Sequence, residues 1–168
     1  MNYSILAELA RALTREDFVA RLPDPVLIVM SELEVEEASG DDDTQVGEQI
    51  AGVPKGLRTS VPNKFEALAV RKKRHSEDKG HITVGRERTC DIVVRTPGIS
   101  KHHAHFIPGE TLQLVDLNSQ NGTWVDGARI APDRPVEIKP GTLVTFGDLV
   151  TQLVSPLELY RLLKSARS

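Results

Sequence analysis

Short apolar runs separated by turn signals fill the chain from residue 65 onward and restrict its fold more than any other feature. The runs are rich in Val, Ile and Thr, and the turns include Asp126-Gly127, Pro140-Gly141 and Gly147-Asp148. These residue types favour strands, and Asp-Gly is typical of a two-residue hairpin turn with positive φ. Many short strands at close spacing predict an all-β sandwich. The expected strands are Ala67–Lys72, His81–Gly85, Asp91–Val94, Ala104–Ile107, Leu112–Asp116, Thr123–Val125, Val136–Ile138, Leu143–Phe146 and Leu149–Val154.

Helices are expected near both ends of the chain. Apolar residues recur at helical spacing over residues 5–13, and Thr14 with Asp17 three residues later resembles a capping box for a second short helix. Near the C-terminus, Ser155-Pro156-Leu157-Glu158 combines a Ser cap, Pro at the first helical position and Glu at the third. This combination predicts a final short helix.

The chain is expected to divide into four segments. Residues 1–30 form an N-terminal helical extension that ends in the short apolar strand Val26–Met30. An acidic and then irregular linker covers residues 31–64, the β-sandwich covers 65–155, and the C-terminal helix covers 156–168. Because the N-terminal elements are too small to bury their own apolar faces, they should pack on another part of the chain.

Charge is unevenly distributed along the 168 residues. Residues 1–48 carry three basic and twelve acidic side chains, whereas residues 49–168 carry eighteen basic and twelve acidic ones, within a net charge of -3. The second part should therefore attract anions. Cys90 is the only cysteine, so no internal disulfide can form. No apolar run approaches the about 20 residues of a spanning helix, so we expect a soluble cytoplasmic protein without a membrane partner.

Three short polar motifs lie between the predicted strands. They are Gly85-Arg86, Ser100-Lys101-His102-His103 and the segment 116–123, which reads Asp-Leu-Asn-Ser-Gln-Asn-Gly-Thr. A phosphate dianion binds well to a guanidinium that donates two parallel hydrogen bonds, a hydroxyl donor and an ammonium. The motifs supply all three groups, and Asn121 can both donate to and accept from the backbone of an extended peptide. Loops at one end of a sandwich can bring such residues together.

The order and separation of these motifs resemble the forkhead-associated (FHA) family. Gly-Arg is followed by Ser-x-x-His, then by Asp-Leu-x-Ser-x-Asn-Gly-Thr with Trp-Val-Asp-Gly directly after it, and finally by Gly-Thr-Leu-Val-Thr-Phe-Gly-Asp. The resemblance spans just over half of the chain. It implies an eleven-stranded sandwich that binds phosphothreonine through loops at one end, with no cofactor and no catalytic activity.

The resemblance also implies a role for each site residue. Arg86 would pair with the phosphate, Ser100 would donate its hydroxyl to a phosphate oxygen, and Lys101 would add positive charge. Asn121 would hold the peptide main chain beside the phosphothreonine. Gln120 stands where some members use Thr or Arg for a further contact, so the sequence departs from the family there. The residues expected to support the site without contacting ligand are Gly85, His103, Ser119 and Gly122.

Metal, catalytic and nucleic-acid sites are each disfavoured. His102, His103 and His105 have no adjoining Cys, Asp or Glu that would complete a four-ligand metal site. Ser100 and His103 lack the strand-turn-helix elbow of a nucleophile. The basic run Arg71-Lys72-Lys73-Arg74-His75 has few aromatic neighbours for base stacking. We expect this run to be a solvated hairpin end or to face the acidic linker.

The acidic segment 31–48 suggests a regulatory hypothesis. Thr44 follows three Asp residues, and its phosphorylation would add roughly -1.5 to -2 charges. A Ser/Thr kinase that modified Thr44 would create a segment able to fold back on Arg86, Ser100 and Lys101 and exclude other ligands, because the tether is long enough. The alternative, that residues 31–48 are only a solubilising linker, stays open.

Two functions from different classes stay open. The first is a phosphothreonine-binding adaptor in Ser/Thr kinase signalling. Its partners would be a phosphothreonine-containing protein or its own phosphorylated segment, and the kinase, but not nucleic acid. The second is a phosphate-independent structural or oligomerisation module built from the sandwich and the terminal helices. Arg86, Ser100 and Asn121 favour the adaptor, because a purely structural module has no need of that set.

Overall fold

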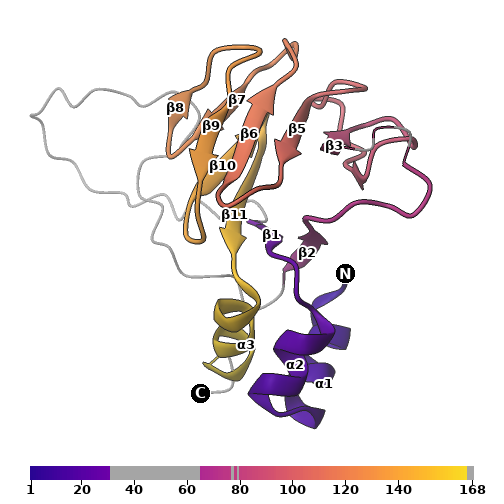
Figure 1. Ribbon diagram of the computed structural model, residues 1–168, viewed down its shortest axis with the longest axis vertical. Helices are drawn as coiled ribbons and strands as arrows, with labels where there is room; N and C mark the ends of the chain where they lie inside the picture. The colour runs from indigo at the N-terminus through magenta and orange to yellow at the C-terminus, as the bar shows by residue number, and fades with distance from the viewer. Residues whose placement is uncertain (31–64, 77, 79, 166–168) are drawn as a thin grey trace, which may run out of the picture.

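The computed structural model describes residues 1–30, 65–76, 78 and 80–165, which fold into two packed β-sheets and three helices (Figure 1). Eleven strands lie among these residues, six in one sheet and five in the other, and this confirms the predicted all-β sandwich. Sheet A has the spatial order β2 (Glu66–Ala69), β1 (Val26–Val29), β11 (Leu149–Val154), β10 (Leu143–Phe146), β7 (Thr123–Val125) and β8 (Ala128–Arg129). Sheet B has the order β4 (Ile92–Val93), β3 (Ile82–Gly85), β5 (Ala104–Ile107), β6 (Leu112–Asp116) and β9 (Val136–Ile138).

Alternate residues of facing strands build the core between the sheets. Ile82 and Val84 of β3 and Ala104 and Phe106 of β5 are buried, while the residues between them are partly exposed, as the two-residue period of a strand requires. The ring of Phe106 meets that of Phe146 in sheet A edge-on, with centroids 6.3 Å apart. Truncating a buried aromatic residue of this kind costs about 3–5 kcal/mol, so this core provides a rigid base for the loops above it.

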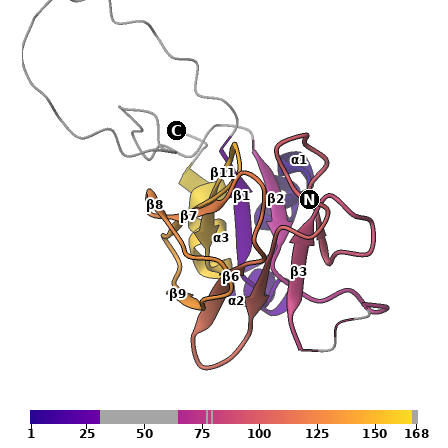
Figure 2. The same ribbon diagram turned by 90° about the horizontal axis from the view of Figure 1, so that it is seen from above.

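The N-terminal extension contributes a strand to the interior of sheet A. β1 lies between β2 and β11, antiparallel to both, and Figure 2 shows β1 beside β2. Leu27 faces Leu68 on one side and Leu153 on the other, and it is fully buried in the core between the sheets. The sandwich therefore depends on residues that precede the acidic segment.

The three helices pack against β1, β2 and β11 of sheet A. They are α1 (Tyr3–Ala12), α2 (Arg15–Arg21) and α3 (Pro156–Ser165), and Figure 1 shows them together at one end of the molecule. Their buried residues join those of β1, β2 and β11 in a second apolar cluster. The expected packing of residues 1–30 on another part of the chain is thus present. None of the helices in the described part of the chain has the length and apolar character that crossing a membrane requires.

Both predicted helix caps are present. The Thr14 hydroxyl accepts a hydrogen bond from the Asp17 N–H at 3.2 Å and donates to the Asp17 carboxylate at 2.7 Å. Ser155 accepts from the Glu158 N–H at 3.2 Å, while the Glu158 carboxylate accepts from the Ser155 N–H at 2.8 Å. Caps of this kind contribute about 0.5–2 kcal/mol each, which explains why short helices begin at these positions.

The loops that carry the predicted site lie at the end of the sandwich away from α3. β6 ends and β7 begins at this end, where Thr123 of β7 pairs with Phe146 of the neighbouring strand β10. β11 starts here and runs toward α3 at the opposite end.

The Asp126-Gly127 turn predicted from the sequence lies between β7 and β8, with φ values of 49° and 83°.

Candidate functional site

Backbone hydrogen bonds bring the predicted site loops together. The Arg86 N–H donates to the Ser100 carbonyl at 2.9 Å, and the next residue donates to the Lys101 carbonyl at 3.1 Å. The Gln120 N–H donates to the Ser100 hydroxyl oxygen at 3.1 Å, and the Asn121 side-chain amide donates to the Gly98 carbonyl at 3.0 Å. The five residues predicted to contact ligand therefore lie in one region at the end of the sandwich.

The polar groups of this region are available to a ligand. Arg86, Lys101, Gln120 and Asn121 are exposed, and Ser100 is half-buried. Within the described ranges, neither Arg86 nor Lys101 makes a salt bridge. The Ser100 oxygen already accepts from Gln120, so its own hydrogen can donate to an anion. The region thus presents a guanidinium, an ammonium and a hydroxyl donor.

His103 ties two of the loops together from below. It is fully buried, and its Nδ1 accepts from the Ser100 N–H at 3.1 Å. The proton must then lie on Nε2, which donates to the Gly122 carbonyl at 3.0 Å. Burial lowers the pKa of His103 below its ordinary value. The neutral ring therefore fixes the position of Ser100 relative to the loop between β6 and β7.

Two glycines permit the close approach of these loops. A Cβ on Gly85 would lie 2.1 Å from the carbonyl oxygen of Lys101, well inside van der Waals contact. Gly122 has a φ of 81, and a Cβ there would lie 2.6 Å from Nε of Arg129. Gly85 requires the absence of a side chain because the contact is with backbone, whereas Gly122 is favoured chiefly by its left-handed backbone, since the Arg129 side chain could move.

Asp116 organises the loop between β6 and β7, a role that the loop motifs did not predict. Its buried carboxylate accepts hydrogen bonds from the Ser119 N–H at 3.0 Å, from the Ser119 hydroxyl and from the Thr123 hydroxyl at 2.6 Å. Ser119 is itself buried below the site. An Asp that accepts from the backbone three residues on is a turn signal that the spacing Asp-x-x-Ser contains.

Asp91 is a second residue that sequence reasoning missed. Its buried carboxylate accepts from the backbone N–H groups of Lys73 at 2.7 Å and Thr83 at 2.8 Å, and Lys72 lies 3.5 Å away as an ion pair. Burial raises the pKa of Asp91, but these hydrogen bonds outweigh it, so the pKa lies below the ordinary value. The basic run from Arg71 is therefore only partly solvated, because its centre is fixed to Asp91, directly before β4.

Two further residues near the loop motifs, Cys90 and Trp124, can be placed. Cys90 is fully buried, and burial raises the pKa of its thiol. Trp124 is half-buried, and the guanidinium of Arg129 lies 5.5 Å from its ring centroid. Thr44 and the acidic segment lie outside the described residues.

Comparison with known proteins finds similarity in the same part of the chain. The family model of the FHA domain matches residues 82–147. The chain is 32% identical over 74 residues to a protein phosphatase 1 regulatory inhibitor subunit PPP1R8 homolog of Arabidopsis thaliana, covering 43% of this chain and 20% of that protein. It is 38% identical over 77 residues to the human angiogenic factor with G patch and FHA domains 1, covering 40% of this chain and 11% of that protein.

These curated relatives are much longer proteins, since the chain spans a fifth or less of their length. Among solved structures, the FHA domain of CT664 from Chlamydia trachomatis is 18% identical, with a TM-score of 0.49 over 79% of this chain and 97% of that one. The matched segment contains all three loop motifs, from Gly85-Arg86 to the Asn-Gly-Thr that begins at Asn121. Residues 82–147 therefore match the FHA domain family, as the order of the motifs predicted.

Proposed function

We propose that the protein is a non-enzymatic adaptor that binds phosphothreonine segments of other proteins. The observation that carries this proposal is the cluster of Arg86, Ser100 and Lys101, whose loops are joined by backbone hydrogen bonds at one end of the sandwich. A guanidinium, a hydroxyl donor and an ammonium at one place suit a phosphate dianion. The FHA domain is an independent reason to expect phosphopeptide binding.

Each side chain takes a distinct part in the proposed complex. Arg86 donates two hydrogen bonds to the phosphate, Ser100 donates one, and Lys101 adds a charge from the rim. Asn121 already donates to Gly98 through its amide nitrogen, so its side-chain oxygen can accept from the peptide backbone. Gln120 positions Ser100 through its backbone, and its exposed side chain contacts the peptide beside the phosphothreonine.

The residues beneath the surface are proposed to hold this arrangement without touching ligand. His103 and Ser119 are buried, and both make hydrogen bonds to the loops that carry Ser100 and Asn121. Gly85 and Gly122 allow those loops to approach their neighbours closely. A site preorganised in this way binds its ligand with less loss of conformational entropy.

The proposed pathway is Ser/Thr kinase signalling in the cytoplasm, with regulation by the acidic segment. In this proposal a kinase phosphorylates Thr44, and the modified segment occupies the site of Arg86 and Ser100 in place of an external partner. The support is the sequence, which places Thr44 in an acidic stretch on the same chain as a site that carries Arg86 and Lys101 and attracts anions. A tether of this length gives an effective concentration near the millimolar range.

Fluorescence anisotropy with a threonine peptide in phosphorylated and unphosphorylated form tests the function. We expect binding of the phosphorylated form only, and a loss of about tenfold or more for Arg86→Ala, on the scale of removing a charged pair at an interface. Arg134→Ala is the matched control, since Arg134 is exposed on the segment between β8 and β9. Equal affinity for the two peptides would instead support the phosphate-independent structural module.

A further inference from the structure

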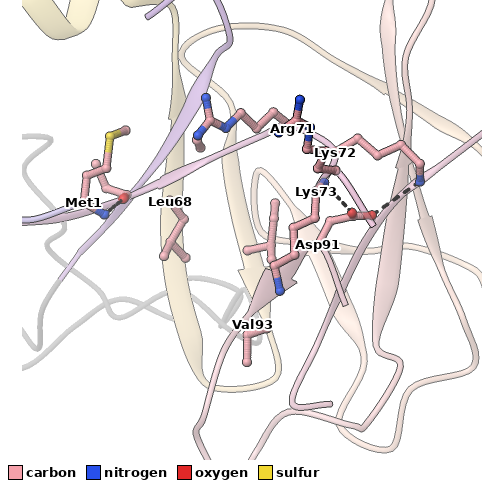
Figure 3. A pocket seen from close by; sticks show the side chains of 11 residues that line it. Met1, Leu68, Arg71, Lys72, Lys73, Asp91 and Val93 are labelled. Carbon is pink, nitrogen blue, oxygen red and sulfur yellow. Dashed lines mark hydrogen bonds and ion pairs between the residues drawn. The ribbon is translucent and has the colours of Figure 1, made fainter. Parts of the chain in front are cut away.

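A groove separates the edges of the two sheets on a side of the molecule that the proposed function does not use. It lies between β2, the last strand of sheet A, and β4, the last strand of sheet B. The hollow has a volume of about 640 Å³, and Figure 3 shows Met1 at one end and Arg71, Lys72 and Lys73 on the other side of Leu68. A second hollow of about 510 Å³ shares Leu68 and Val93 with it and continues the groove toward Thr96.

The floor of the groove is apolar. Leu68 of β2, and Ile92 and Val93 of β4, line it, and Leu68 packs against the main core while remaining partly exposed. Apolar surface between two strand edges is the kind of surface that an added strand covers with alternate side chains.

The outer edge of β2 already accepts an extended segment. The Ala67 N–H donates to the Met1 carbonyl at 3.0 Å, and Asn2 pairs with Glu66 in antiparallel orientation. The Val70 N–H points the other way, to the Pro25 carbonyl beside β1. Because alternate residues of a strand face the same edge, the Ala69 N–H points outward like that of Ala67. The Ala69 N–H therefore lies on the edge of β2 that faces away from β1 and can donate to an added strand.

The rim of the groove is strongly basic. Four cationic side chains from Arg71 to Arg74 line it together with the carboxylate of Asp91, and the carboxylate of Asp78 lies 4.0 Å from Lys72. The hydrogen bond that the Lys73 N–H donates to Asp91 and the ion pair of Asp91 with Lys72 fix this run in place. Arg71 and Arg74 are exposed, and in the part of the chain that the structure describes they make no salt bridge. Their charges are thus available to an acidic ligand.

We propose that this groove is a second binding site, which takes an extended acidic segment of a partner protein as an added strand on β2. The backbone of the ligand pairs with Ala69. Its apolar side chains lie on Leu68 and Val93, and its carboxylates meet Arg71 and Arg74. The site needs no phosphate and does not involve Arg86, so it would give the adaptor a second contact that operates independently of phosphorylation.

The test uses the full chain and a fluorescein-labelled peptide of about ten residues in which Glu alternates with Val, a length sufficient to pass the whole groove. We expect saturable binding that weakens with salt, and a loss of about tenfold or more for the double variant Arg71→Glu and Arg74→Glu. Arg134→Glu and Arg86→Ala should bind like the wild type. Hydrogen exchange at the Ala69 amide should slow when the peptide is added.

Four outcomes would overturn the proposal. The first is a double variant that binds the peptide as tightly as the wild type. The second is an Ala69 amide whose exchange rate does not respond to the peptide. The third is slow hydrogen exchange at the Ala69 backbone N–H without peptide that becomes fast when each Asp and Glu within residues 32–43 is replaced by Asn or Gln. This result would assign the groove to the chain's own segment. Loss of binding in Arg86→Ala would place the peptide at the phosphate site and likewise refute a second site.

Discussion

The backbone N–H of Gln120 donates to the hydroxyl oxygen of Ser100 at 3.1 Å, so two loops twenty positions apart in the chain share one hydrogen bond. The bond sets the direction of the remaining hydroxyl hydrogen, because an oxygen that accepts from one side donates from another. Ser100 is therefore both a structural link and a candidate phosphate donor.

Replacing Ser100 by Ala should weaken phosphothreonine-peptide binding by roughly ten- to hundredfold, since a hydrogen bond to a charged group is worth about 1.5–3 kcal/mol. Anisotropy titration measures this loss. Ser100→Thr keeps the hydroxyl and should restore most of the affinity. If Ser100→Thr is as stable as the wild type but binds the peptide no better than Ser100→Ala, the hydroxyl has no role in binding.

Adding a methyl group at Gly85 should destabilise the domain. The new Cβ would lie 2.1 Å from the Lys101 carbonyl oxygen, and relief requires a shift of backbone. We expect Gly85→Ala to lower the free energy of unfolding by about 1–3 kcal/mol or more in urea titration. Gly80→Ala is the control, because its nearest neighbour would lie 3.9 Å away, and it should change stability by less than about 0.5 kcal/mol.

Asp116 should prove as important for the site as the residues that face solvent. Asp116→Asn keeps the shape but loses the charge that accepts from Ser119 and Thr123, so it should cost about 1–3 kcal/mol of stability and weaken phosphopeptide binding. Asp133→Asn, at an exposed turn residue with a φ of 58, is the matched control. An Asp116→Asn protein with unchanged stability and affinity would contradict this assignment.

The stability of the protein should decrease as the pH is lowered, because His103 has a lowered pKa in the folded state. Its pKa is lower in the folded protein than the ordinary value of 6.5, so its contribution is complete above about 6.5 and is lost as the pH falls below it. Urea midpoints at about pH 7.5 and about pH 5.5 should therefore differ less in His103→Asn than in the wild type. The lowered pKa of His105 acts in both proteins, so the difference between them isolates His103. Identical pH dependence would contradict the buried neutral ring.

The N-terminal strand should matter to the sandwich as much as any later strand. Leu27 is fully buried between the sheets, and Leu27→Ala should cost about 2–5 kcal/mol. Leu22→Ala removes the same atoms from a half-buried position beyond α2 and should cost clearly less. Thermal unfolding followed by circular dichroism compares the two. Equal costs would show that β1 adds little to the core.

Local signals in the sequence predicted the elements well, because each signal and its consequence lie within a few residues. The caps at Thr14 and Ser155 and the turn at Asp126-Gly127 are examples. The strand expected over Ala67–Lys72 ends instead at Ala69, since the carboxylate of Asp91, eighteen positions after Lys73, draws the chain away from the sheet. Such a distant partner leaves no periodicity in the sequence.

The site was predicted only through the ordered family motifs. Composition and spacing supplied the residue types that suit phosphate, but the bonds that join their loops run between separate strands. The strand β8, Ala128–Arg129, was not predicted because neither residue is β-branched or aromatic, so the pair carries no strand signal. The interior position of β1 could not be inferred either, because the pairing of Leu27 with Leu68 and Leu153 spans the whole chain.

That interior position of β1 affects how the protein can be dissected. The family match begins at residue 82 and ends at residue 147, so a fragment cut at those limits would lack β1, β2 and β11. Half of the strands in sheet A would be missing, and β10 would become an unprotected margin open to pairing with other chains. Recombinant fragments intended for ligand studies therefore need to begin ahead of Val26 and continue through Val154.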